Sequence, residues 1–114
     1  MAISISNIRV HGRNRIQAVL LSAVTGTGNG EWIHMAGLAP FSVRVAGITT
    51  ATVEVDGDNA LARPADNTHG SPLATAVTAD GYINITTPAE WVKARCTAYT
   101  SGTITATLVA TGAR

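Results

Sequence analysis

Residues 91–110 read WVKARCTAYT-SG-TITATLVA, and this stretch decides the fold. Both halves alternate apolar and polar residues with a period of two, which is typical of half-buried β-strands. Ser101-Gly102 separates the halves and predicts a hairpin turn between them. Because a hairpin alone is only marginally stable in water, its apolar rows predict a second β layer that covers them. These rows consist of Val92, Ala94, Cys96 and Ala98 in the first half and Ile104, Ala106, Leu108 and Ala110 in the second.

The rest of the chain contains short segments with strand character, separated by Gly, Pro, Asn and Asp turns. Gly47-Ile48-Thr49 predicts a hairpin between residues 41–46 and 50–56, on whose outer face Arg44 and Glu54 could pair. In all, about eight or nine short strands predict an all-β fold, an antiparallel β-sandwich of the jelly-roll or immunoglobulin-like kind. The predicted core is Ile16, Leu20, Phe41, Val43, Val45, Val53, Val55, Ile83, Ile85, Val92, Ala94, Cys96, Ile104, Ala106 and Leu108.

The composition predicts a single domain with a weakly charged surface. A chain of 114 residues can form a substantial core without disulfide bonds. Charged residues make up 13 % of it, about half the usual share of a soluble globular protein. Low charge is typical of a subunit whose surface is covered by partners. The net charge of +1, without a basic patch or an aromatic platform, gives no reason to expect a nucleic-acid partner.

The N-terminal region has its own pattern. Its first residues, MAISISNI, lack the features of a signal peptide, and no run in the chain is long enough to span a membrane. We therefore expect a protein that is made in a cytoplasm and has no membrane partner. Alternation through Ile3 and Ile5 slips phase before Ile8 and Val10, which predicts either a β-bulge or a separate arm. We favour an arm over residues 1–12, followed by a single domain over residues 13–114.

Two segments near the N-terminus are candidates for contacts with partners. Arg9, Arg13 and Arg15 concentrate positive charge, either as a solvated loop or as a docking patch for an acidic partner. Residues 16–24 are apolar on both faces, with Val19 and Leu21 on the face opposite the predicted core. Such a strand must be covered on both sides, and in a small antiparallel domain the second cover is often another subunit. A helix is the competing interpretation, but no capping residue supports it.

Residues 56–72 form a long irregular stretch, and a loop of this length in a small domain is usually a functional or binding element. Asp56, Asp58, Asn59 and Asp66 offer oxygen ligands of the kind that calcium uses. The order of residues lacks the third acidic position, the glycine and the terminal glutamate of an EF-hand loop. We therefore favour ordinary turn chemistry and predict no metal site.

No catalytic constellation is recognisable elsewhere. Residues 25–30 are rich in glycine but lack the lysine and the following helix of a phosphate-binding loop. His11, His34 and His69 stand apart, without partners at metal-ligand spacing. Cys96, the only cysteine, lies on an apolar row and is expected to be a small buried residue rather than a reactive thiol. We expect no enzyme activity and no cofactor.

Two parts of the chain resemble a known group of proteins. Residues 41–56, FSVRVAGITTATVEVD, and residues 78–108, which include TADGYINI and the stretch quoted first, are similar to small β-sandwich virion proteins of tailed bacteriophages. The resemblance is to head decoration or cement proteins in particular. It implies a subunit that clamps neighbouring major capsid proteins, commonly as a trimer, while other members of the group sit in the tail or collar. No binding residue is implied, because the shared pattern defines the sandwich and not a site.

Two functional hypotheses follow. The first is a virion protein that decorates the capsid, bridges major capsid subunits and forms a homotrimer. The second is a tail, collar or surface module that binds carbohydrate or a receptor through Trp32, Trp91 or Tyr99. The candidate interface residues are Ile3, Ile5, Arg9, Arg13, Arg15, Val19, Leu21, Asp56, Asp58 and Arg63.

Overall fold

The computed structural model describes residues 8–10, 15–65, 67 and 70–111. All the strands of this part of the chain are antiparallel and belong to one hydrogen-bonded sheet, which confirms the predicted all-β class. None of the described residues forms a helix long and apolar enough to cross a membrane. The strands are β1 (Ile8–Val10), β2 (Arg15–Val24), β3 (Gly28–Asn29), β4 (Ile33–His34), β5 (Phe41–Asp58), β6 (Ser71–Pro72), β7 (Gly81–Ile85) and β8 (Trp91–Thr111).

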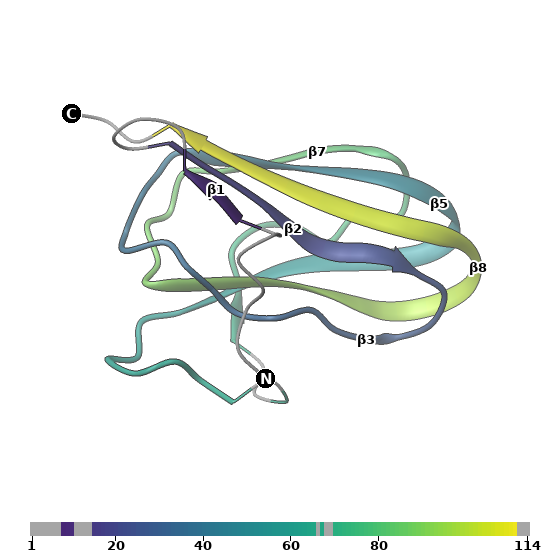
Figure 1. Ribbon diagram of the computed structural model, residues 1–114. Helices are drawn as coiled ribbons and strands as arrows, with labels where there is room; N and C mark the ends of the chain where they lie inside the picture. Colours follow the sequence, from purple (N-terminus) through teal and green to yellow (C-terminus); the bar gives the residue numbers. More distant parts are fainter. Residues whose placement is uncertain (1–7, 11–14, 66, 68–69, 112–114) are drawn as a thin grey trace.

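β5 and β8 form the centre of the sheet and pair with each other along their whole length. They are 18 and 21 residues long, and their register runs from Phe41 opposite Ala110 to Asp58 opposite Trp91. Figure 1 shows that both strands curve together at one end of the molecule and then run back. The sheet is therefore folded over on itself, and its two halves face each other across the core.

This arrangement corrects both predicted hairpins. Residues 91–110 and 41–56 each belong to one bent strand, and the two arms of a strand pair with the other strand instead of with each other. Val43 lies opposite Leu108, and Val55 lies opposite Ala94. A bend within a strand leaves the alternation of side chains on each arm unchanged, as a hairpin turn would. The predicted apolar rows are therefore buried, with the exception of Ala98, which is exposed.

The bend depends on two glycines that lie against each other. Gly47 has φ of 88° and Gly102 has φ of 125°, and these values are in the region that disfavours residues with a Cβ. The register of β5 and β8 shifts between Ala46 and Ile48, as at a β-bulge, which sharpens the bend of a strand. A Cβ on Gly47 would lie 1.8 Å from the carbonyl oxygen of Thr103. The backbones of β5 and β8 therefore approach too closely at this point for any side chain.

The shorter strands extend the two halves of the sheet. In one half, β2 pairs with the C-terminal arm of β8, β1 pairs with β2, and β7 pairs with the N-terminal arm of β5. In the other half, β3 and β4 pair with the N-terminal arm of β8, and β6 pairs with the end of β5. Residues 8–10 of the predicted N-terminal arm therefore lie on the chain's own sheet as β1, while residues 1–7 and 11–12 lie outside the described part.

The core between the halves agrees closely with the prediction. All of the predicted core residues are buried except Ile16, which is partly buried. β2 differs from the prediction, because an irregularity between Val19 and Leu21 places both Leu20 and Leu21 in the interior. The prediction also omitted Trp32, Ile33, Met35 and Ala89, which are buried.

Gly47→Ala is expected to destabilise the protein by more than about 2 kcal/mol, because the new Cβ meets backbone atoms and the positive φ adds strain. The measurement is the free energy of unfolding in urea. Gly26→Ala is the matched control, since a Cβ at Gly26 has nothing within 4 Å. Equal stability of the two variants would contradict the close approach of β5 and β8 at the bend.

Candidate functional site

A strap, defined here as residues 59–65, covers the outer face of the sheet where β5 ends and β8 begins. Two indole groups fasten it: Trp32 Nε1 donates to the carbonyl oxygen of Ala65, and Trp91 Nε1 donates to that of Ala60, both over 3.0 Å. Trp32 is fully buried beneath the strap. Residues 56–72, which the sequence predicts to be a functional or binding element, therefore include a segment that two hydrogen bonds hold against the sheet.

Buried charges lie under this cover. Asp56 and Lys93 are both 0 % exposed, although they point to the side of the sheet away from the main core, and they are opposite each other in the register of β5 and β8. The Nζ atom of Lys93 lies 4.7 Å from the centroid of the Trp32 ring, at the distance of a cation–π contact. The ring of Trp32 therefore stabilises the buried cation of Lys93.

Arg95 joins two carboxylates in the same cluster. Its Nε donates to Asp56 Oδ2 over 2.7 Å, and its Nη2 donates to Glu54 Oε2 over 2.8 Å. The predicted pair between Arg44 and Glu54 is wrong, because Arg44 lies on the other arm of β5, opposite Thr107. Asp56 Oδ1 is buried and makes no hydrogen bond with the described residues.

The surroundings of Asp56 raise its affinity for a proton. The pKa of Asp56 is raised to about 7, chiefly by burial and also by a hydrogen bond with the neighbouring Glu54 and the charge of that residue, while Arg95 opposes the shift. The hydrogen bond to Glu54 is the main cause of the raised pKa of Arg95. Arg95 therefore stays charged, and the proton that is exchanged near neutral pH belongs to Asp56.

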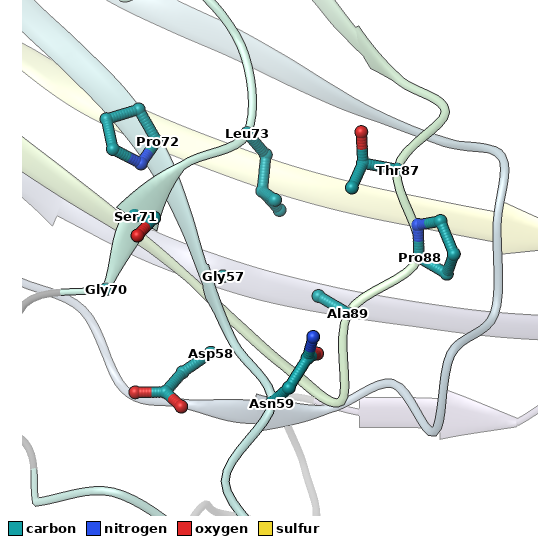
Figure 2. A pocket seen from close by; sticks show the side chains of 10 residues that line it. All are labelled: Gly57, Asp58, Asn59, Gly70, Ser71, Pro72, Leu73, Thr87, Pro88 and Ala89. Carbon is teal, nitrogen blue, oxygen red and sulfur yellow. The ribbon is translucent and has the colours of Figure 1, made fainter.

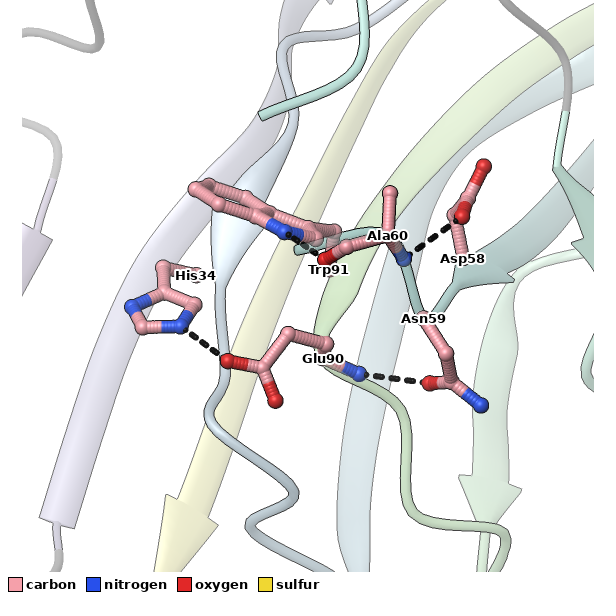
Figure 3. A network of polar contacts seen from close by, with 6 residues as sticks. All are labelled: His34, Asp58, Asn59, Ala60, Glu90 and Trp91. Carbon is pink, nitrogen blue, oxygen red and sulfur yellow. Dashed lines mark hydrogen bonds and ion pairs between the residues drawn. The ribbon is translucent and has the colours of Figure 1, made fainter. Parts of the chain in front are cut away.

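Figure 3 shows the polar contacts at the edge of the strap. His34 Nε2 and Glu90 Oε2 are 2.6 Å apart, with side chains 51 % and 41 % exposed. The ring of His34 also lies against Trp91, with centroids 4.6 Å apart. Since the pair is largely in water, it contributes little to stability by charge alone.

The first residues of the strap are held by side-chain caps on the backbone. Asn59 Oδ1 accepts a hydrogen bond from the backbone N–H of Glu90, and Asp58 Oδ1 accepts one from that of Ala60, each over 2.9 Å. The contact of Asp58 is the local one that Asx side chains commonly make in turns, and it agrees with the turn chemistry favoured from the sequence. Asn59 instead holds the start of the strap to Glu90, which is 31 residues away in the chain.

A hollow of about 480 Å³ lies beside the strap. The side chains of Leu73 and Ala89 point into it, and Asp58 and Asn59 lie along one side, as Figure 2 shows. It brings together no set of acid, base and nucleophile. Within the described ranges, no group of three or more His, Cys, Asp or Glu side chains could hold a metal ion.

The predicted interface residues fall in different places. Asp56, Asp58 and Arg63 lie in or beneath the strap region, with Asp56 fully buried and the other two partly buried. Leu21 is buried in the core and Val19 is partly exposed on the outer face of β2. Of the remaining candidates, Ile3, Ile5 and Arg13 lie outside the described residues, and Arg9 and Arg15 are described only as backbone in β1 and β2.

Cys96 is buried, with 2 % exposure, and burial raises the pKa of its thiol. The Sγ atom donates to the carbonyl oxygen of Ala98 over 3.3 Å. A protonated, inaccessible thiol is a packing residue, as the sequence analysis predicted.

Comparisons with known proteins give one structural likeness. The fold is similar to a solved structure described as the SPBc2 prophage-derived protein YomS, with a TM-score of 0.63 and 17 % sequence identity. The likeness covers 91 % of this chain and 98 % of that protein. No family model matches the sequence, and no curated protein matches it. At this identity the likeness shows a shared fold.

Arg95→Gln is expected to destabilise the protein by roughly 3 kcal/mol at pH 8, because it leaves two adjacent carboxylates, one of them buried, without their shared cation. The loss should be smaller at pH 5, where a proton on Asp56 removes one of the charges. Urea unfolding at both pH values measures it. Arg44→Gln, at an exposed position on the same sheet, is the control and should change stability by less than about 0.5 kcal/mol; a similar loss in both variants would refute the role of the cluster.

Proposed function

We propose that this chain is a structural subunit of a bacteriophage particle, a β-sandwich decoration or cement protein that binds the outside of the capsid and bridges major capsid subunits. The observation that carries the proposal is the likeness of its fold to a prophage-derived protein along almost the whole of both chains. A subunit of this kind needs no cofactor and no catalytic step. It would be found in the virion after assembly in the host cytoplasm.

The outer face of the β2–β8–β5–β7 half supports this proposal by its composition. Strand pairing aligns side chains across it in two rows. Among the side chains of these two rows only Arg44 is charged, and Tyr82 is 64 % exposed. Arg9 and Arg15 hold register positions at the β1–β2 edge of the same face. A broad β surface with few charges costs little to desolvate and suits a contact with another protein. The rows are Gln17, Val109, Ser42 and Asn84, and Val19, Thr107, Arg44 and Tyr82.

The proposed partners are the major capsid protein and further copies of this chain, with a trimer favoured. A trimer can place one copy over each of three neighbouring capsid subunits and so resist their separation. The proposal includes no nucleic-acid or membrane partner.

A tail, collar or surface module that binds carbohydrate or a receptor is the alternative, and it has less support. Trp32 is fully buried, and the Tyr99 hydroxyl donates to the carbonyl oxygen of Gly102 over 2.6 Å. Of the three aromatic residues considered as stacking platforms, Trp91 beside the exposed His34 is the best placed for a ligand. A glycan array probed with the isolated protein tests this alternative.

Val109→Glu is expected to weaken binding to phage heads by at least about tenfold, because it buries a charge at the centre of the proposed contact. The measurement is co-sedimentation of purified protein with heads assembled without this chain. Thr27→Glu, on an exposed loop outside this face, is the matched control and should bind as the unchanged protein does.

The same preparations test the proposed assembly and effect. Sedimentation should show a trimer, and heads that carry the protein should withstand heat and osmotic shock better than heads without it. A monomer with no affinity for heads would overturn the proposal.

A further inference from the structure

We propose that residues 2–6 of one copy of this chain pair as a β-strand with the outer edge of β7 in a neighbouring copy. This pairing rests on the assembly of several copies proposed above, and it names the two segments that hold the copies together. Three features carry it: the open edge of β7, the pattern of residues 2–6, and the distance between β1 and β7.

β7 is an edge strand. Among the described residues it pairs with β5 alone, and its register with β5 has no shift. Gly81, Tyr82 and Asn84 are exposed. An edge of this kind presents backbone N–H and C=O groups without partners in the sheet, and these groups can pair with a strand from another chain.

β7 lacks the features that protect the other edges of the described sheet. β3, β4 and β6 are two residues long, and β6 contains Pro72. β1 is three residues long and contains Arg9. Short strands, proline and charged side chains all hinder pairing of an edge with another chain. β7 has five residues, GYINI, of which none is charged or a proline, so it is the edge best suited to receive a strand.

The core is also less completely covered on the side of β7. β7 lies beyond β5 in one half of the sheet, and Leu73 and Val77 bond to the backbone of β5 in the other half. Together with Ala74, they pack against the core but are only partly buried. A strand added to β7 with apolar side chains on its inner face would extend the row of Ile83 and Ile85 over this side.

Residues 2–6, AISIS, have the pattern that this position requires. Ile3 and Ile5 fall on one face of an extended strand, and the two serines fall on the other. The segment contains no charged residue and no proline, and isoleucine favours the strand conformation. Paired with β7, it would place both isoleucines in the inward row and both serines in the exposed row.

The β7 that receives the segment belongs to another copy, because the chain's own β7 is out of reach. β1 and β7 are opposite edges of one half of the sheet, with β2, β8 and β5 between them. Strand spacings of about 4.8 Å place these edges roughly 19 Å apart. Ser6 lies within about 7 Å of Ile8 in β1, and Ala2 within about 21 Å. The segment therefore cannot run along its own β7.

The contact joins two different surfaces, the segment before β1 and the edge of β7. A head-to-tail contact of this kind closes into a ring when a constant rotation relates successive copies. The trimer proposed above is such a ring, in which each copy gives its segment to the next. Since strand addition extends a sheet within its own plane, the outer face proposed to contact the capsid stays accessible.

The first test compares the oligomeric state of the full chain with that of two double variants by sedimentation. Ile3→Asp with Ile5→Asp puts two charges into the inward row and should raise the concentration needed for assembly by at least about tenfold. Ser4→Asp with Ser6→Asp is the matched control, because it adds the same charges in the exposed row. It should sediment as the unchanged protein does.

Hydrogen exchange locates the contact and shows that the variant is folded. The amides of residues 81–85 that do not bond to β5 should exchange at least about tenfold faster in Ile3→Asp with Ile5→Asp than in the unchanged protein. The amides of β5 and β8 that pair with each other should exchange equally in both proteins.

Cross-linking tests the pairing without a disruptive substitution. A chain with Ser4→Cys and a differently tagged chain with Asn84→Cys are refolded together and treated with a short bis-maleimide reagent. We expect a covalent pair that carries both tags. Thr27→Cys, on an exposed loop, replaces Asn84→Cys in the matched control and should give no such pair. Cys96 is buried in both chains.

The outcomes separate this pairing from the proposed function. An oligomer that is unchanged in Ile3→Asp with Ile5→Asp, or the absence of the mixed cross-link, would overturn the pairing even if the protein binds phage heads. A monomer that binds heads and loses this binding in the same variant would assign the segment to the capsid protein and also overturn the pairing. A mixed cross-link in a protein without affinity for heads would support the pairing and refute only the capsid function.

Discussion

The pairing of β5 with β8 through a common bend is the interaction on which the rest of the structure depends. Each strand contributes one arm to each half of the sheet, so the same ladder of hydrogen bonds builds both halves and sets their separation. The remaining strands only extend one half or the other. The bend in turn requires that two backbones come within contact distance at Gly47 and Gly102, where a side chain on either strand would push them apart. The fold is thus a single folded sheet because two strands bend at matching positions.

The sequence predicts the class of fold and nearly all of its core because alternation is a local property. Residues such as Val43, Val55, Ala94 and Leu108 show their inward direction whether the chain turns or bends between them. The connection between the arms is different. A glycine with strands on both sides suits a hairpin and a bent strand equally, and only the long-range register distinguishes them. The predicted hairpins failed for this reason, and the predicted pair of Arg44 and Glu54 failed with them.

The candidate site was only partly visible for the same reason. The sequence identifies residues 56–72 as a binding element and names Asp56, Asp58 and Arg63. It does not bring Asp56 to Arg95, which is 39 residues away, or Trp32 to the strap. Once the register of β5 and β8 is known, the cluster of charged residues can be predicted, because Glu54 lies opposite Arg95 and Asp56 lies opposite Lys93. Opposite charges directly across a ladder are a common cross-strand pair. The sequence gives no comparable indication that these charged residues are buried. Their burial depends on tertiary contacts of residues 59–65, whose composition is typical of a polar loop.

The buried cluster also fixes the register that makes it possible. A shift of one residue between β5 and β8 would turn Lys93 and Arg95 toward Val53 and Val55, which lie on the other face of the sheet in the main core. Such a slip is unfavourable because it buries cations among aliphatic side chains without partners. The correct register places these charges on the outer face, where they need a cover as well as each other, and the strap with Trp32 supplies it. The polar cluster and the strap that covers this part of the sheet therefore both depend on the register of the central ladder.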